Sequence, residues 1–251
     1  MIEKHIYDVW FNNKSLADFG VHVNGNKTFD GPEIDYETIE IPGRNGDLHV
    51  YNGRYKNVDL TYRAFIAGDN SLHEADSKRN FSVRMRQLRA YLMSQIGYKR
   101  LEDTYHPDEF RKAVFKGRIE TDAINLMAGE FDLEFSCMPQ RFLKSGEKVK
   151  TFNTHGIIEN PTSYTAKPLV RIYGKGNLTI NGIGITITNS CPYEYVDFDC
   201  EIQDAFYGLN NCNPYITLYD GEFYTLSSGV NDIIFGSGVT KAEITPRWWV
   251  L

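Results

Sequence analysis

The residues that most often perform catalysis or hold metal ions are present in this chain, but their spacing suits neither task. The six histidines are scattered: His5, His22, His49, His73, His106 and His155. None has a second histidine at i+3 or i+4, so no helix can present the histidine pair of a zinc site. The Gly-x-Ser-x-Gly turn of serine hydrolases and a phosphate-cradling glycine-rich loop are also missing. The sequence therefore predicts no enzyme, with no catalytic residue, cofactor or metal.

Two carboxylates and four cysteines leave room for other chemistry. Asp197 and Asp199 share one face of a predicted strand, where they could form a glycosidase pair or a Ca²⁺ site. Alternating acids are also typical of the solvated face of a strand, and we favour that interpretation. The cysteines have neither zinc-site spacing nor the density of a disulfide scaffold, so we expect buried free thiols. They are Cys137, Cys191, Cys200 and Cys212.

Charge is unevenly distributed along the 251 residues, whose net charge is −6. Residues 77–101 carry seven Lys or Arg and no acid, whereas residues 176–240 carry eight acids and no Lys or Arg. The net charge argues against general nucleic-acid binding. The asymmetry indicates either surfaces for different partners or simply the solvated faces of two domains.

No membrane or secretion signal is visible. No apolar run approaches the roughly 20 residues of a membrane-spanning helix, and the amino terminus (MIEKHIYDVW) lacks the pattern of a signal peptide. We therefore expect synthesis in a cytoplasm and no membrane partner.

Alternating hydrophobicity predicts a chain built mainly from β-strands. Apolar side chains recur at every second position over 58–66 and 131–137, as on half-buried strands. Asn-Gly pairs at 24–25, 45–46, 52–53 and 181–182, and Asp-Gly pairs at 30–31 and 220–221, are expected to form hairpin turns. The predicted architecture is dominantly antiparallel β.

One segment has the period of a helix instead. Apolar residues at steps of four, three, four and four fall on a single helical stripe, which predicts a helix packed on the first sheet. They are Phe81, Met85, Leu88, Leu92 and Ile96. Ser77 is the expected N-cap and Gly97 the expected stop, and Arg79 and Arg86 lie on the far side.

The polar segment 144–150 (KSGEKVK) predicts a flexible junction between two domains near residue 145. Beyond it, short apolar runs and frequent turns predict roughly eight strands of a β-sandwich. The chain ends in ITPRWWVL, where Trp248 and Trp249 must point to opposite faces of a strand.

Several motifs along the chain resemble those of the distal tail proteins of long, non-contractile-tailed bacteriophages. The segment 34–48 (IDYETIEIPGRNGDL) and the segments 103–119 and 129–143, the last ending in Pro-Gln-Arg-Phe before Leu143, resemble the first domain of that family. The Ser-Gly-Val-Asn-Asp turn and the terminal Pro-Arg-Trp-Trp resemble its galectin-like second domain. The chain looks like a compact version of the family, without inserted modules.

The resemblance implies a structural protein of the virion rather than an enzyme. Residues 1–145 would form the ring-forming domain and residues 146–251 a galectin-like β-sandwich. It implies a hexameric ring of this chain at the distal end of the tail, between the major tail tube protein and the tail-tip protein of the baseplate. Receptor-binding proteins could attach to the outer domains for host adsorption, and DNA would pass only as cargo through the central channel.

Charge suggests how neighbouring copies could meet in a head-to-tail ring. Acids of one subunit would face arginines of the next, which would fix register more than affinity. The acids are Glu33, Asp35, Glu37 and Glu40, and the arginines are Arg84, Arg86 and Arg89. The simpler interpretation is that both groups are merely solvated, and strand pairing between subunits is a further route.

A carbohydrate-binding module that contacts cell-wall saccharide is the alternative function, because galectin-like sandwiches bind sugars on a tryptophan platform beside polar side chains. Here Trp248 and Trp249 stand at the carboxyl end, and neither begins a Trp-x-x-Glu-x-Arg pattern. The sequence thus departs from the lectin pattern at the residues that would hold the sugar.

Overall fold

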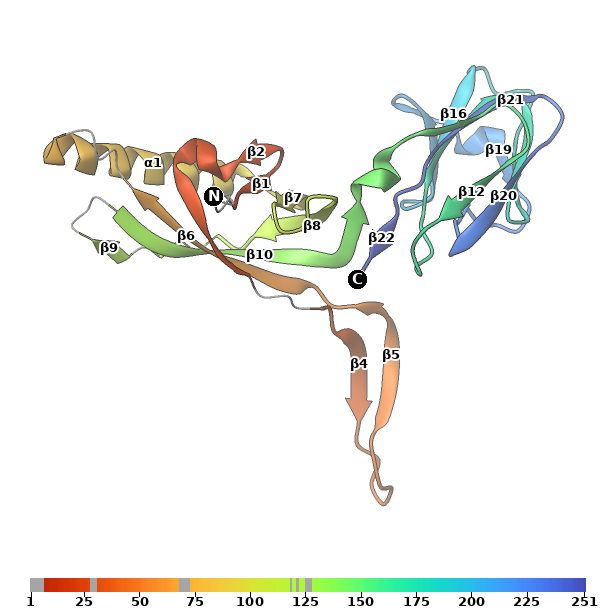
Figure 1. The fold of residues 1–251 in the computed structure, drawn as a ribbon. Helices are drawn as coiled ribbons and strands as arrows, with labels where there is room; N and C mark the ends of the chain where they lie inside the picture. Colours follow the sequence, from red (N-terminus) through yellow and green to blue (C-terminus); the bar gives the residue numbers. More distant parts are fainter. Residues whose placement is uncertain (1–6, 28–30, 68–72, 118, 121, 125–127) are drawn as a thin grey trace, which may run out of the picture. The chain divides into compact units, whose positions relative to one another are not determined.

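The computed structural model of the chain describes residues 7–27, 31–67, 73–117, 119–120, 122–124 and 128–251. The chain divides into two units, residues 1–141 with Leu251 and residues 142–250. Strands predominate in both, and each strand pair with a described register is antiparallel (Figure 1). The predicted mainly β, antiparallel fold is confirmed.

The first unit is built on one antiparallel sheet with the strand order β2-β1-β7-β8-β10-β6-β3, and β9 pairs with β10. These strands are β1 (Val9–Phe11), β2 (Lys14–Ser15), β3 (Val21–Lys27), β6 (Val58–Ala67), β7 (Lys99–Asp103), β8 (Glu109–Phe115), β9 (Asp122–Ile124) and β10 (Ala128–Leu143). Neighbours such as β1 and β7 are far apart in the sequence, so the sheet depends on long-range pairing.

Strands β6 and β10 form the centre of this sheet, in continuous register from Val58↔Cys137 to Ala67↔Ala128. Along both strands burial alternates, and the apolar positions face the core. The strands predicted over 58–66 and 131–137 are confirmed, because one face of each is covered and the other is not.

Helix α1 (Glu74–Ser94) covers one face of the sheet (Figure 1). Phe81, Met85, Leu88 and Leu92 are buried in the core, as the stripe predicted. Ile96 is not: the helix ends two residues earlier, and this side chain is 85% exposed. The N-cap prediction is also wrong, because Ser77 lies inside the first turns, buried, with its N–H bonded to the carbonyl of His73.

Strands β4 (Ile34–Ile39) and β5 (Leu48–Tyr55) form a separate two-stranded sheet, visible as a long hairpin in Figure 1. Its turn contains Gly43 and Gly46, both with positive φ angles that L side chains rarely adopt. The turn predicted at 45–46 is confirmed, as is that at 181–182 between β14 and β15. The pairs at 24–25 and 52–53 lie inside β3 and β5, so those turns are wrong, and Asp30 lies outside the described residues.

The second unit has two antiparallel sheets around one core. The first has the order β11-β21-β13-β16-β17-β18, and the second the order β12-β20-β14-β15-β19. The first comprises β11 (Lys150–Phe152), β13 (Leu169–Gly174), β16 (Tyr195–Asp199), β17 (Asp204–Tyr207), β18 (Asn210–Asn211) and β21 (Val239–Thr245). The second comprises β12 (Gly156–Asn160), β14 (Gly176–Ile180), β15 (Ile183–Ile187), β19 (Ile216–Leu218) and β20 (Gly229–Phe235), and β22 (Trp249–Val250) follows near the end of the chain.

These sheets contain more strands than the eight predicted, because several are only two or three residues long. The segment predicted as the junction between the two domains has local structure. It forms a short 3-10 turn (Lys144–Glu147), and a Cβ placed on Gly146 would lie 2.3 Å from the backbone nitrogen of Trp248. Gly146 therefore allows a close packing contact within the second unit.

Candidate functional site

The β4–β5 hairpin exposes large apolar side chains on both of its faces. On one face, Tyr36 and Tyr51 pair across the strands, with ring centroids 5.8 Å apart. On the other face, Ile39 pairs with Leu48, next to Val50. These five side chains are between 39% and 53% exposed. A two-stranded hairpin is marginally stable alone in water, so both faces are suited to contact with another protein surface.

Ion pairs hold the base of the hairpin. Arg54 Nε donates to Asp35 Oδ2 over 2.6 Å and lowers the pKa of that carboxyl. Lys56 Nζ lies 3.4 Å from Glu33 Oε2. Two of the four acids predicted for the subunit interface are therefore already paired within the hairpin.

The remaining interface residues differ in how they are engaged. Arg84 Nη1 donates to the Ala67 carbonyl over 2.8 Å, and Arg89 Nη2 donates to the Ile119 carbonyl over 3.4 Å. Glu37, Glu40 and Arg86 are exposed. In the part of the chain that the structure describes, none of these three has an ion-pair partner, and no predicted acid contacts a predicted arginine.

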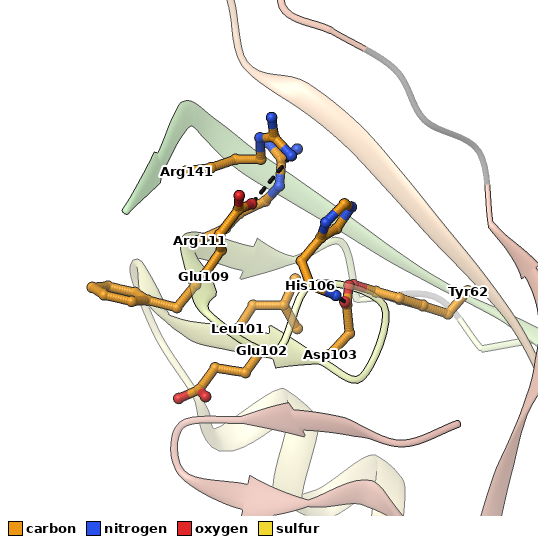
Figure 2. Close-up of a pocket in the computed structure, with 9 residues that line it drawn as sticks. Tyr62, Leu101, Glu102, Asp103, His106, Glu109, Arg111 and Arg141 are labelled. Atoms are coloured by element: carbon orange, nitrogen blue, oxygen red, sulfur yellow. Dashed lines mark hydrogen bonds and ion pairs between the residues drawn. The ribbon is translucent and has the colours of Figure 1, made fainter. Parts of the chain in front are cut away.

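A small pocket in the first unit lies between β7, β8 and the end of β10 (Figure 2). Asp103 is buried there, and it accepts hydrogen bonds from Tyr62 Oη over 2.5 Å and from the backbone N–H of His106 over 3.0 Å. Arg141 Nη1 lies 3.1 Å from Glu109 Oε2. The cavity of about 20 Å³ has room for about one water molecule and is too small for an organic substrate.

A shallow groove of about 360 Å³ lies on the outer face of β6 and β10. Glu120, Glu130, Asp132 and Glu134 line it, and Arg63 is the basic residue among them. Such a surface repels phosphate groups rather than binding them.

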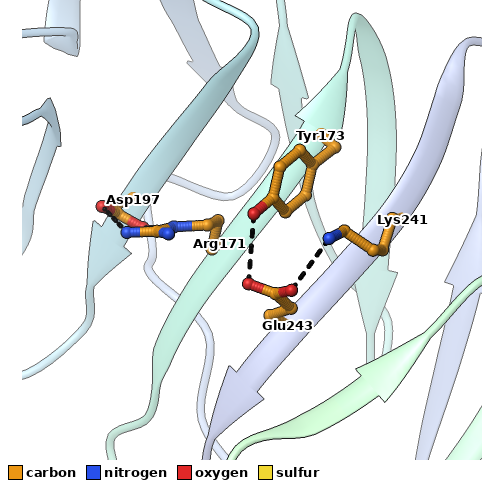
Figure 3. Close-up of polar contacts among 5 residues, drawn as sticks. All are labelled: Arg171, Tyr173, Asp197, Lys241 and Glu243. Carbon is orange, nitrogen blue, oxygen red and sulfur yellow. Dashed lines mark hydrogen bonds and ion pairs between the residues drawn. The ribbon is translucent and has the colours of Figure 1, made fainter.

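The outer face of the six-stranded sheet carries two polar networks, shown in Figure 3. Arg171 binds Asp197 through two hydrogen bonds of 2.7 and 2.9 Å. Glu243 accepts from Lys241 over 2.9 Å and from Tyr173 Oη over 3.2 Å, which lowers the pKa of Glu243. The charges on this face are thus neutralised within the sheet.

Asp197 and Asp199, the carboxylate pair of the sequence, are bound by different guanidinium groups. Asp197 is buried against Arg171, and Asp199 receives two hydrogen bonds from Arg247, of 2.7 and 2.9 Å. Neither carboxylate is free to bind Ca²⁺ or to act as a general acid. In the residues that the structure describes, no three potential ligands gather in a metal site.

We expect the Asp199–Arg247 pair to stabilise the second unit in a pH-dependent way. Arg247 lowers the pKa of Asp199 below its unfolded value of about 3.9. The stabilisation is therefore present above that pH and is lost as the pH falls through the folded pKa. Asp199→Asn should lower the free energy of unfolding by about 1–3 kcal/mol at neutral pH, and by less near pH 3, in urea titrations. The exposed Asp220→Asn is the control, expected to change it by less than about 0.5 kcal/mol.

The tryptophans do not form an open sugar platform. Trp248 is buried in the core, and the Trp249 ring stacks on Tyr164 at 4.4 Å while its Nε1 donates to the Thr165 carbonyl. The four cysteines are buried free thiols, as predicted, and burial raises the pKa of Cys200 to about 12.

The apolar faces of the hairpin were not predicted from the sequence. The signal was present, because β4 and β5 carry large apolar residues at both odd and even positions. A strand with one solvated face would alternate.

Comparison with known proteins finds a match in fold among solved structures, but none in sequence. No protein-family model matches this sequence, and no curated protein matches it. Among solved structures, the fold is similar to that in a crystal structure of the Dit protein (gp19.1) of phage SPP1, with a TM-score of 0.68 and 12% identity. The match covers 98% of this chain and 100% of that chain, which is described as a hub of the adsorption apparatus in phages that infect Gram-positive bacteria. The resemblance to distal tail proteins is thus confirmed for the fold.

Proposed function

We propose that this chain is the distal tail hub protein of a long-tailed bacteriophage. Residues 1–145 would close into a ring of six copies that joins the tail tube to the tail-tip protein, with DNA passing through the channel. Residues 146–251 would form a galectin-like sandwich that anchors peripheral adsorption components. The protein acts through assembly geometry and catalyses no reaction.

The observation that carries this proposal is the match to the phage SPP1 hub along nearly the full length of both chains. A match confined to one sandwich would be weaker support, because such folds host many functions. Here one match spans both units of this chain, covering 98% of it and 100% of the hub protein. That combination favours a tail hub over a carbohydrate-binding module.

The hairpin supplies a physical route to a ring. Its two apolar faces would be covered if it lay against a neighbouring copy, and a head-to-tail contact that repeats closes into a ring when the rotation allows it. In a closed ring of this kind, the hairpin of every copy would be covered by the next copy, and no hairpin would stay exposed.

Native mass spectrometry and negative-stain electron microscopy of the purified full chain test this proposal. We expect an annular oligomer, either alone or once the neighbouring tube and tip proteins are added. A protein that stays monomeric under both conditions contradicts the proposed hub.

Charge reversal on the hairpin tests the electrostatic part of the interface. Glu37→Lys with Glu40→Lys should shift rings toward monomers, because like charges would then face Arg86 of the next copy. We expect about a tenfold weaker contact, seen as a lower oligomer fraction in light scattering at low salt. Adding Arg86→Glu should restore the rings.

The matched control is Glu222→Lys, which reverses an exposed acid of the second unit. It should leave the oligomer fraction unchanged. Rings that are equally stable in the double hairpin variant and in this control would exclude the electrostatic contact.

A further inference from the structure

Strand β12 forms one edge of the five-stranded sheet in the second unit. It pairs with β20 in continuous register over five residues, from Gly156↔Ile233 to Asn160↔Gly229. In the described part of the chain, no strand pairs with its other side. An edge of this kind presents a row of backbone N–H and C=O groups that can pair with a further strand.

The β12 edge lacks three of the protections that natural proteins use against strand addition, and Glu159 is its one charged residue. Natural edges carry lysine, an internal proline or a bulge. The sequence of β12 is Gly-Ile-Ile-Glu-Asn, its register shows no bulge, and Pro161 stands only after its last residue. The edge is therefore regular, and no strand among the described residues pairs with it.

Aliphatic side chains continue this edge on the outer face of the sheet. Ile157 on β12 is 64% exposed, and Val230 and Ile234 on β20 are 62% and 51% exposed. The inward residues of the same strands are buried, so these three share one face. We call Ile157, Val230 and Ile234 the β12 edge patch.

The patch is acidic as well as aliphatic. Glu159 lies opposite Val230, and Asp232 lies opposite Ile157, both on the exposed face. Neither carboxylate has an ion-pair partner among the described residues. Because residues 176–240 contain no Lys or Arg, β20 and the strands beyond it up to β19 supply no positive charge.

Buried asparagines hold the edge in place. Asn231 is fully buried, and its Nδ2 donates to the carbonyl of Ile158 over 3.2 Å and to that of Gly229 over 2.9 Å. Asn160 Nδ2 donates to the Leu226 carbonyl over 3.0 Å. The edge is thus already in the conformation that an added strand requires, which reduces the ordering cost of binding.

We propose that β12 accepts an extended segment of another polypeptide as an additional strand. The side chains of this segment that face the exposed side of the sheet, at every second position, would include both aliphatic and Lys or Arg residues. The aliphatic side chains would cover the β12 edge patch, and the basic ones would pair with Glu159 and Asp232. Backbone pairing supplies affinity, and the alternation supplies specificity. The proposal rests on the hub function in one respect, that the segment belongs to a peripheral tail component.

The test uses the full chain and a short acetylated peptide in which valine and lysine take turns at every second position, with threonine between them, so that both kinds of side chain face the same side of the added strand. We expect saturable binding by calorimetry, weakened by salt, with slower hydrogen exchange at the amides of Gly156–Asn160. The variant Ile157→Lys should bind about tenfold or more weakly, because it adds the charge that natural edges use against pairing. Ile202→Lys, at a side chain 66% exposed on the turn after β16, is the matched control and should bind normally.

The proposal is overturned by no binding, by equal binding of a peptide with glutamate in place of lysine, or by protection outside β12. Self-association through β12, which sedimentation at rising concentration would reveal, also overturns it. Thermal melting of Ile157→Lys checks that the unit is folded. Ring formation is measured separately on the same protein, so failure of the β12 edge and failure of the hub can be told apart.

Discussion

In the proposed ring, replacing Ile39 and Leu48 with serine is expected to convert the oligomer into monomers. The two side chains pair across the hairpin, and each leaves about two-fifths of its surface exposed in the isolated chain, 41% and 39%. Covering that surface in a neighbour is worth about 1.5 kcal/mol per side chain. Losing both should weaken each contact by about 3 kcal/mol, roughly a hundredfold. Mass photometry of the full chain, with its assembly partners where they are needed, measures the shift.

The fold of the first unit should survive this change, because neither side chain belongs to its core. The control replaces Ile202 and Leu209 with serine, since both are well exposed on turns of the second unit. If the hairpin forms the ring contact, only the hairpin variant loses its rings. Equal ring stability in the two variants would show that the hairpin lies outside the contact.

The elements that the sequence predicts well are those set by local patterning. The alternation in β6 and β10 and the stripe from Phe81 to Leu92 were sufficient to predict these strands and this helix. Burial on one face requires a period of two in a strand and of 3.6 in a helix. The end of α1 could not be predicted from this stripe, because the stripe continues to Ile96 while the helix stops at Ser94. The last apolar residue in phase with the stripe therefore lies beyond the helix and is exposed.

The site residues could be predicted less well, because their partners are distant in the sequence. The sequence shows no partner near Asp197 or Asp199. In the structure, Arg171 binds Asp197 from 26 residues away, and Arg247 binds Asp199 from 48 residues away. The seven predicted interface residues likewise divide into those that bind a partner within the chain and those that do not. Those that bind within the chain do so through tertiary contacts, and Glu37, Glu40 and Arg86 stay available for a partner.

Phe135→Ala should produce the largest loss of stability of any single change in the first unit. The ring is fully buried at the centre of β10, and its centroid lies 5.1 Å from Phe11, 5.6 Å from Phe115 and 6.0 Å from Tyr62. Removing it leaves a cavity that three aromatic rings cannot readily fill. We expect a loss of about 3–5 kcal/mol in the free energy of unfolding.

Native-state hydrogen exchange can assign that loss to one unit. Amides of α1, β6 and β10 that exchange through unfolding of the first unit should exchange roughly a hundred to several thousand times faster, whereas those of β13 and β16 should hardly change. Phe65→Ala is the control, because that ring lies 39% exposed on the opposite face of β6 and contacts His22. Equal acceleration in both halves would mean that the two cores unfold together and not as independent units.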